Sequence, residues 1–463
     1  MNAIPHTGRP ATYPPPFAAW CACLVLTLGC VLGFADRGIL NLFIIPIQRD
    51  LHLSDTQISL VIGLAFGVFN AVFGLPAARW VDSRSRTGIA TVGVLLWSLA
   101  TGVCGLATNF WQLFLARVAV GVGEATVTPS GVSLLADFFP PARRGLPVGV
   151  FYGGMFLGSG GSLLLGGLLW RRLGDRLIQA PLIGPLHSWQ VILMLVAALG
   201  FIVAPLTFAI REPARIDGER QIGAGGVPIG VVARFYRTHL KALVGHNVGF
   251  CLHSFALHAG MAWIPTLLVR TYGWSLTQAG ATYGIMMLIL GPAGSAAAGL
   301  LADALSRRGR TDGKLLVCIG AGVVCAAMSI ALALRLSPSN LLLALGTFAF
   351  FGTFSLPLAA GSLQEVMPNA MRGQAIAIYV AITNILAGSL AATAVAVLTD
   401  YVFHDRNLLR LAFGCVGFSA CASSSLVLLA TLASFRATVA ATRAPAIADG
   451  APPAAAAPVL AEL

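Results

Sequence analysis

Residues 78–86 read ARWVDSRSR, and the same pattern of an acid followed by basic residues returns 221 positions later as GLLADALSR at residues 299–307. A second stretch, DFFPPARRG at residues 137–145, returns 228 positions later as EVMPNAMRG at residues 365–373. Each charged copy comes directly after a long apolar run. Matching stretches at matching places predict a chain of two duplicated halves.

The composition of the 463 residues is that of a protein embedded in a lipid bilayer. Hydrophobic residues make up 57% of the chain and charged residues only 10%, whereas about a quarter of the residues of a soluble domain are charged. Apolar runs of about 20 residues, the length needed to cross the hydrocarbon core as a helix, recur along the sequence. We therefore expect an all-α polytopic membrane protein with twelve transmembrane helices in two six-helix bundles related by a pseudo-twofold axis.

Polar stretches divide the chain into five parts. We expect a disordered tail, an N-terminal bundle, a cytoplasmic linker, a C-terminal bundle and a second disordered tail, at residues 1–16, 17–210, 211–241, 242–436 and 437–463. The linker carries six Lys or Arg residues and predicts an interfacial helix around residues 231–240. The predicted membrane helices span residues 17–47, 56–80, 88–108, 110–137, 145–170, 188–210, 242–270, 276–302, 314–335, 339–365, 372–402 and 408–436.

The net charge of +12 would suggest a nucleic-acid partner in a soluble protein. With the N-terminus inside, however, 19 of the 29 Lys and Arg residues fall in cytoplasmic segments and 8 in outer loops, where Arg171, Arg172 and Arg176 are the main exception. This asymmetry follows the positive-inside rule. We expect an integral protein of the plasma membrane (the inner membrane of a bacterium) with both termini in the cytoplasm, a monomer that binds no nucleic acid. The nine cysteines lack metal-ligand spacing, so we expect no metal site.

Four ionisable residues lie well inside apolar runs, namely Asp36, Arg37, Arg117 and Glu124. A charge at the bilayer centre costs at least ~2.5–3.5 kcal/mol, so it is normally paired or faces a cavity. Arg117 and Glu124 are seven residues apart and share one helix face. Asp36 and Arg37 point about 100° apart, so at most one of them faces a cavity squarely and the other ties its helix to a neighbour.

Two acids and two arginines form a neutral set when all four are ionised, and the function of this set can be interpreted in two ways. In one, the set is a static ion-pair lock between the first and fourth helices. In the other, Asp36 or Glu124 takes up a proton when its distance to an arginine changes between conformations, because burial disfavours a charged carboxylate and a nearby arginine favours it. We favour proton coupling through these two acids, with Arg37 and Arg117 as ion-pair partners or substrate anchors.

The repeated loops predict a cytoplasmic gate. Asp82 and Asp303 are each followed four residues later by an arginine, and such charges can hold the inner ends of two bundles together in one conformation and release them in another. The alternative is a solvated loop whose ion pairs contribute little. The recurrence of the pattern favours the gate, which comprises Asp82, Arg86, Asp137, Arg144, Asp303, Arg307, Glu365 and Arg372.

The stretch GLLADALSRR at residues 299–308 resembles the signature loop of the major facilitator superfamily, and the first copy is a degenerate version that keeps Asp82 and Arg86. FADR at residues 34–37 and RVAVGVGEA at residues 117–125 resemble the Spinster-like branch. The resemblance implies a 6+6 fold with alternating access, proton-linked acids at positions 36 and 124, and lysophospholipid or sphingolipid-like cargo. Organic-anion symporters of the superfamily share parts of the pattern, so a hydrophilic carboxylate is the alternative substrate.

The second half offers weaker candidates for polar groups in a cavity, which are His253, His258, Tyr283, Tyr379 and Asn384. An imidazole there can sense pH or contact substrate, or it can simply be hydrogen-bonded within the bundle.

The spacing of the repeat shows that the ionisable set is not duplicated. A shift of 228 takes Arg117 and Glu124 to uncharged residues, and a shift of 221 takes Asp36 to a leucine, although it takes Arg37 to His258. We expect the first half to carry proton coupling and the second to shape the apolar side of the cavity.

Together these patterns predict a secondary active transporter for an amphipathic or anionic organic solute, and not an enzyme. The sequence has no GxxxxGK[ST] loop, so protons rather than ATP are the expected driving force, and no cofactor is expected. A lipid-acting membrane enzyme would need a catalytic set such as HExxH or GxSxG, which the sequence lacks. A channel would not require duplicated gates, and a receptor would leave the intramembrane acids unexplained.

Overall fold

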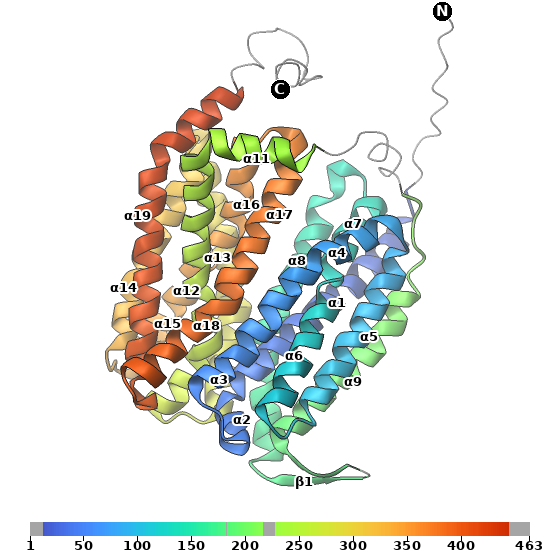
Figure 1. The fold of residues 1–463 in the computed structure, drawn as a ribbon, viewed down its shortest axis with the longest axis vertical. Helices are drawn as coiled ribbons and strands as arrows, with labels where there is room; N and C mark the ends of the chain where they lie inside the picture. The colour runs from blue at the N-terminus through green and yellow to red at the C-terminus, as the bar shows by residue number, and fades with distance from the viewer. Residues whose placement is uncertain (1–12, 182, 216–226, 444–463) are drawn as a thin grey trace, which may run out of the picture.

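Twelve helices within the described part of the chain are long and apolar enough to cross a membrane. The computed structural model describes residues 13–181, 183–215 and 227–443. Two groups of helices, α1 to α9 and α11 to α19, lie side by side (Figure 1). The predicted all-α fold of two six-helix bundles is confirmed.

The N-terminal half contains α1 (Pro16–Leu42), α2 (Ile44–Leu51), α3 (Asp55–Ser59), the π-helical turn η1 (Leu60–Leu64), α4 (Ala65–Ser83), α5 (Arg86–Cys104), α6 (Phe110–Glu124), α7 (Val127–Phe138), α8 (Gly145–Leu173) and α9 (Ser188–Phe208). The C-terminal half contains α11 (Ile229–Thr238), α12 (Leu240–Tyr272), α13 (Leu276–Arg307), α14 (Gly313–Ala333), α15 (Pro338–Gly352), α16 (Ser355–Val366), α17 (Arg372–Thr383), the π-helical turn η4 (Asn384–Gly388), α18 (Ser389–Val397), the π-helical turn η5 (Leu398–Val402), the short η6 (Arg406–Leu408) and α19 (Leu409–Arg443).

Three helices that the sequence predicts as continuous are interrupted, and the helix before each interruption ends four or five residues before a proline. The interruptions follow α1, α6 and α15, ahead of Pro46, Pro129 and Pro357. A proline has no N–H to bond to the carbonyl four residues earlier, so the helical ladder breaks there. Pro129 and Pro357 are 228 residues apart, so this break belongs to the internal repeat.

The boundaries differ from the predictions at the C-terminal end. The prediction that disorder begins at residue 437 is wrong for residues 437–443, which continue α19. Val439 is fully buried against the core of the C-terminal half, and Thr442 donates a hydrogen bond to the carbonyl of Val366 (3.3 Å). Packing therefore extends the helix beyond its apolar run. Most of the predicted tails, and residues 216–226 of the predicted linker, lie outside the described residues.

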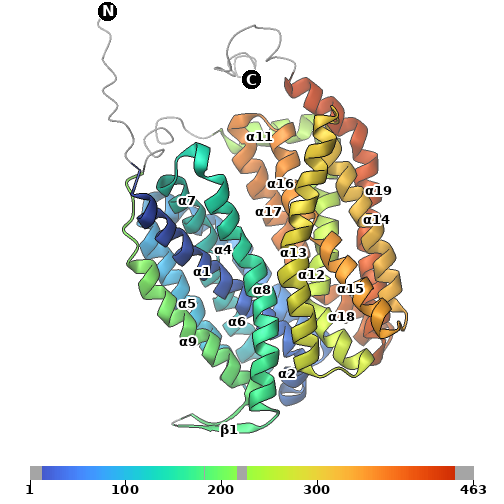
Figure 2. The same cartoon turned by 180° about the vertical axis from the view of Figure 1, so that it is seen from behind.

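Helix α11 and a β-hairpin lie at opposite ends of the molecule (Figures 1 and 2). A helix is present where the interfacial helix was predicted, namely α11, and its Val232 is buried against the C-terminal half. Strand β1 (Leu177–Ala180) pairs antiparallel with β2 (Gly184–His187), a hairpin that the sequence did not predict. We call the end that carries the hairpin the hairpin end, and the opposite end, where α1 begins and α19 ends, the termini end (Figures 1 and 2).

The two halves touch along helices α8 and α13, where glycines allow a close crossing. A Cβ atom on Gly160 would lie 2.6 Å from the carbonyl oxygen of Gly284, and one on Gly284 would lie 2.6 Å from that of Gly160. Thr277 also donates a hydrogen bond to the carbonyl of Gly167 (2.8 Å). Small residues let helix backbones approach in a membrane, so this crossing is a natural pivot between the halves.

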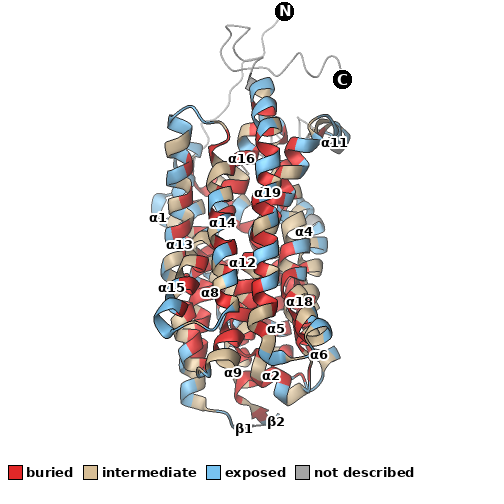
Figure 3. Cartoon of the chain, turned by 90° about the vertical axis from the view of Figure 1, so that its left-hand side faces the viewer, coloured by how far each residue is buried: buried red, intermediate tan, exposed pale blue. Residues whose placement is uncertain are grey.

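Exposed residues lie on the outer faces of the bundles, while buried residues line their interiors (Figure 3). Many of the exposed side chains are large and apolar, including Leu24, Leu99, Leu199, Leu343 and Leu429. In water such a surface would be unfavourable, but it is what a lipid bilayer requires.

Candidate functional site

The four ionisable residues predicted within the membrane come together between α1 and α6, and they pair crosswise. Asp36 pairs with Arg117, and Arg37 pairs with Glu124. Each acid thus has its arginine on the other helix, and the set is neutral when all four groups are ionised. The two ion pairs thus connect the first and fourth predicted helices.

The Asp36–Arg117 pair is sealed inside the N-terminal half. Both side chains are 1% exposed. The second carboxylate oxygen of Asp36 accepts a hydrogen bond from the Thr101 hydroxyl on α5 (2.8 Å). Both oxygens of Asp36 are therefore satisfied, as a buried carboxylate requires. This pair joins α1, α5 and α6, and it has the character of a structural element.

The Arg37–Glu124 pair is more open. The Arg37 side chain is 32% exposed while that of Glu124 is 4% exposed. The Arg37 guanidinium lies over the rings of Phe34 (4.4 Å) and Phe66 (4.2 Å), so two aromatic faces help to stabilise its charge. Of the two adjacent residues on α1, Arg37 is therefore the one that faces an accessible surface, whereas Asp36 ties the helix to its bundle.

This open pair also has unused hydrogen-bonding capacity. Within the described residues, Oε1 of Glu124 and Nε of Arg37 are buried and have no hydrogen-bond partner. Nε of Arg117 in the sealed pair is likewise buried without a partner, so it is the greater exposure of Arg37 that distinguishes the open pair as a place where a further group can bind. Gly33 leaves room for the acid, because a Cβ there would lie 3.2 Å from Oε2 of Glu124.

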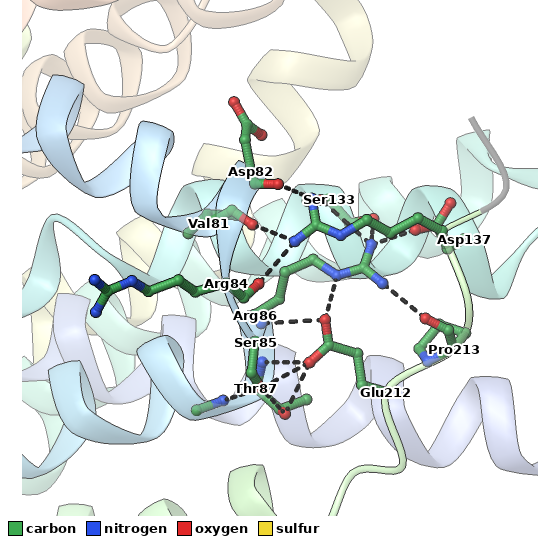
Figure 4. A network of polar contacts seen from close by, with 12 residues as sticks. Val81, Asp82, Arg84, Ser85, Arg86, Thr87, Ser133, Asp137, Glu212 and Pro213 are labelled. Atoms are coloured by element: carbon green, nitrogen blue, oxygen red, sulfur yellow. Dashed lines mark hydrogen bonds and ion pairs between the residues drawn. The ribbon is translucent and has the colours of Figure 1, made fainter. Parts of the chain in front are cut away.

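At the termini end, Arg86 forms the centre of a buried polar network in the N-terminal half (Figure 4). It pairs with Asp137 at the end of α7 and with Glu212 after α9 (2.8 Å), and it donates a hydrogen bond to the carbonyl of Pro213 (2.9 Å). Burial alone would raise the pKa of Glu212, but hydrogen bonds from Arg86 and Ser85 outweigh it and lower the pKa to about 2.

The C-terminal half has a matching pair, Lys314 with Glu365. These residues are related to Arg86 and Asp137 by the same shift of 228. The sequence analysis missed Lys314, although the spacing of the repeat points to it. The repeat therefore places an ion pair between two helices of the same half, once in each half.

The remaining predicted gate residues have different roles. Arg144 donates a hydrogen bond to the carbonyl of Phe139 (2.8 Å), and its counterpart Arg372 donates to that of Met367 (3.2 Å). Asp82 accepts from Arg215 through its backbone carbonyl, at the end of α4 (Figure 4). Across the described ranges, the carboxylates of Asp82 and Asp303 and the guanidinium of Arg307 form no ion pair.

The hairpin end carries a polar network that connects the two halves, and the sequence analysis did not predict it. Asp55, at the first turn of α3, is fully buried. It accepts two hydrogen bonds from Arg270 of α12 (2.8 Å each), one from Thr399 of η5 (3.0 Å) and one from Gln48 of α2 (2.7 Å). A carboxylate of the first half is thus held mainly by donors of the second.

Further contacts surround this network. The backbone N–H of Thr56 donates a hydrogen bond to Asp400 (2.7 Å), and Arg406 donates to the carbonyl of Leu53 (3.0 Å). Deeper in the membrane the halves meet backbone to backbone, because a Cβ on Gly63 would lie 2.4 Å from the carbonyl oxygen of Ser389. The hairpin end is therefore closed by a polar layer above a tight helix crossing.

The predicted polar candidates of the second half lie in different surroundings. His253 is buried within its own bundle, with Nε2 bonded to the carbonyl of Phe351 (3.1 Å). Tyr283 and Tyr379 are buried as well, and Asn384 is half-buried at the start of η4. His258 is half-buried on α12, on the side that faces α1.

Comparison with known proteins identifies the family. A family model described as "Major Facilitator Superfamily" matches residues 26–392. The chain belongs to the major facilitator superfamily. An "MFS-type efflux pump" of Mycolicibacterium smegmatis is 29% identical over 84% of this chain and 86% of its own length. A "Probable L-galactonate transporter" of Escherichia coli is 25% identical over 85% of this chain and 86% of its own.

A solved structure shares the fold of the whole molecule. It is a bacterial homologue of the human lysosomal transporter Spinster in an inward-facing and unoccupied conformation, with a TM-score of 0.74 and 22% sequence identity. The match covers 92% of this chain and 98% of that one. The protein is therefore an integral membrane transporter of this superfamily and not an enzyme, as the sequence predicted.

Proposed function

We propose that this protein is a proton-coupled transporter that carries an organic anion with a carboxylate group by alternating access. The observation that carries the proposal is the Arg37–Glu124 pair, in which a half-exposed arginine inside the membrane is neutralised by a buried acid. The relative named an L-galactonate transporter supports a carboxylate as the substrate.

The coupling follows from competition for one guanidinium. A substrate carboxylate that binds Arg37 displaces Glu124, since both are anions that seek the same planar donors. The displaced carboxylate is buried, and burial without a cation favours its protonated form. One anion and one proton then enter together, and the net charge of the site remains zero. Asp36 and Arg117 stay paired and hold the two helices in place.

The charge distribution supports an orientation in the membrane. The termini end carries most of the Lys and Arg residues, so by the positive-inside rule it lies in the cytoplasm. The contacts at the hairpin end then close the outer side, and the structure corresponds to an inward-facing conformation. We place the protein in the plasma membrane, the inner membrane of a bacterium.

A second candidate substrate is an amphipathic anion such as a lysophospholipid. The rings of Phe34 and Phe66 beside Arg37 favour it, because they offer apolar surface next to the cation.

Transport in proteoliposomes tests the proposal. An imposed inward proton gradient should drive accumulation of radiolabelled galactonate by the wild-type protein. Glu124→Gln should abolish gradient-driven accumulation while retaining exchange of internal for external substrate, and Arg37→Gln should abolish both. Asp175→Asn, which removes an exposed ion pair with Arg49, serves as the control. Gradient-driven accumulation that is equal in wild type, Asp36→Asn and Glu124→Gln would contradict proton coupling at this site.

A further inference from the structure

His258 occupies the position on α12 that the internal repeat assigns to Arg37 on α1. The two residues are 221 positions apart, which is the spacing of the first repeated stretch. Helices α1 and α12 touch where Asn41 donates a hydrogen bond to the carbonyl of Met261 (3.2 Å). Arg37 and His258 each lie about one helical turn from this contact, toward the termini end. Both residues therefore lie beside the contact between the two halves.

The imidazole of His258 has one nitrogen in use and one available. Nδ1 lies 2.8 Å from the carbonyl oxygen of Ser254, and because a carbonyl only accepts hydrogen bonds, Nδ1 carries the proton. In the described part of the chain no group bonds to the other nitrogen, Nε2. Nε2 is also not enclosed by protein. Nε2 is therefore neither hydrogen-bonded nor fully enclosed, and the residue as a whole is half-buried.

The other histidines of α12 differ in this respect. His246 has both ring nitrogens bonded, to Asn247 (3.0 Å) and to Ser362 (2.7 Å). His253 is fully buried, and its second nitrogen, Nδ1, is enclosed by protein. Both residues serve the interior of the C-terminal bundle, and within the described part of α12 His258 is the histidine with a ring nitrogen that is neither bonded nor enclosed.

A hydroxyl group is the partner that suits this nitrogen. Neutral His258 accepts a hydrogen bond at Nε2 and protonated His258 donates one, and a hydroxyl does either. An alkyl chain does neither and would remove water from Nε2 without replacing its hydrogen bond.

We propose that His258 is a specificity-determining residue that binds a hydroxyl of a hydroxylated carboxylate whose carboxylate group is held by Arg37. This inference rests on the proposed function and assigns one end of the substrate to each half of the molecule. A solute held at both ends draws the halves together, which is what a transporter needs from its correct substrate.

Binding to the purified protein, measured by isothermal titration calorimetry, tests the inference without requiring transport. Galactonate and hexanoate have six carbons and one carboxylate each, but only galactonate has hydroxyls. Wild type should bind galactonate about tenfold more tightly than hexanoate, which is the gain in affinity expected from one good hydrogen bond. His258→Leu should weaken galactonate binding about tenfold and leave hexanoate binding unchanged, while His258→Gln should restore part of the preference. His253→Leu, the same substitution five residues earlier, should not change the ratio of the affinities for galactonate and hexanoate.

The outcomes separate the two proposals. If His258→Leu retains the full preference for galactonate, the role of His258 is overturned while the proposed function stands. If Arg37→Gln binds both acids as tightly as wild type, the proposed function fails as well. A wild-type protein that binds neither acid, but binds a lysophospholipid equally with and without His258, also overturns the inference.

Discussion

The two ends of the molecule use ion pairs for different purposes. At the termini end, Arg86–Asp137 and Lys314–Glu365 each connect two helices of one half. At the hairpin end, Asp55–Arg270 connects one half to the other. In the proposed alternating access, pairs of the first kind can stay intact when the bundles separate, whereas a pair of the second kind must break before the bundles can separate there. The repeat explains the first kind, and only the second kind reports on the conformation.

The largest effect is expected from locking the hairpin end. Thr56 and Asp400 come from different halves and are joined by a hydrogen bond (2.7 Å). A cross-link between cysteines at these positions should abolish transport in proteoliposomes, because the outer side can no longer open, and reduction should restore it.

A cross-link between cysteines at positions 49 and 175 is the matched control. These residues form an ion pair at the same end but within the N-terminal half, so the cross-link should leave transport intact. Equal loss in both variants would show that the cross-linking chemistry, and not the connection between halves, stops the cycle.

Removal of the buried ion pair at the hairpin end should have the next largest effect. Asp55→Asn leaves Arg270 without its anion, and breaking a buried pair costs about 3–5 kcal/mol. The closed hairpin end loses this stabilisation, so the population should shift toward a state that is open there. Distances between spin labels on the two halves, measured by double electron–electron resonance, should lengthen at the hairpin end. Unchanged distances would mean that the helix crossing alone keeps this end closed.

The helix crossing below the polar network can be tested by adding one methyl group. Gly63→Ala places a Cβ 2.4 Å from the carbonyl oxygen of Ser389, and overpacking of this kind costs about 1–3 kcal/mol. The distances between spin labels on the two halves should show a partial opening of the hairpin end. Gly74→Ala on α4 is the control, since a Cβ there meets nothing within 4 Å. An effect of similar size in both variants would point to helix propensity instead of the contact with Ser389.

The smallest effect is expected from pH at the termini end. The pKa of Glu212 is about 2 in the folded protein, against an ordinary value of 4.5. A depressed pKa stabilises the fold above the ordinary value, and this stabilisation is lost as the pH falls from about 4.5 to about 2. The site is partly exposed, so we expect a contribution of about 1 kcal/mol. Melting temperatures of the solubilised protein across this pH range should fall less steeply for Glu212→Gln than for wild type, and parallel curves would exclude the contribution.

Much of the site was predictable because charge in a membrane is rare. Asp36, Arg37, Arg117 and Glu124 stand out in apolar runs, and the need to neutralise them predicts that they meet. The crosswise pairing was not predictable, because it depends on the rotation of two helices about their axes. Asp55 and Arg270 were missed for a different reason. Charges at the ends of helices are common, and nothing in the sequence marks two of them as partners.

The sequence by itself determined the membrane location, the two duplicated halves and the residues that carry charge into the bilayer. Each of these follows from composition and spacing, which report the cost of placing a side chain in lipid. The tertiary structure alone decided which acid meets which arginine, which end of the molecule is closed, and that Arg37 and His258 lie beside the same contact between the halves. These features depend on how helices and halves pack against each other, and packing brings together residues that are 81 to 353 positions apart along the chain.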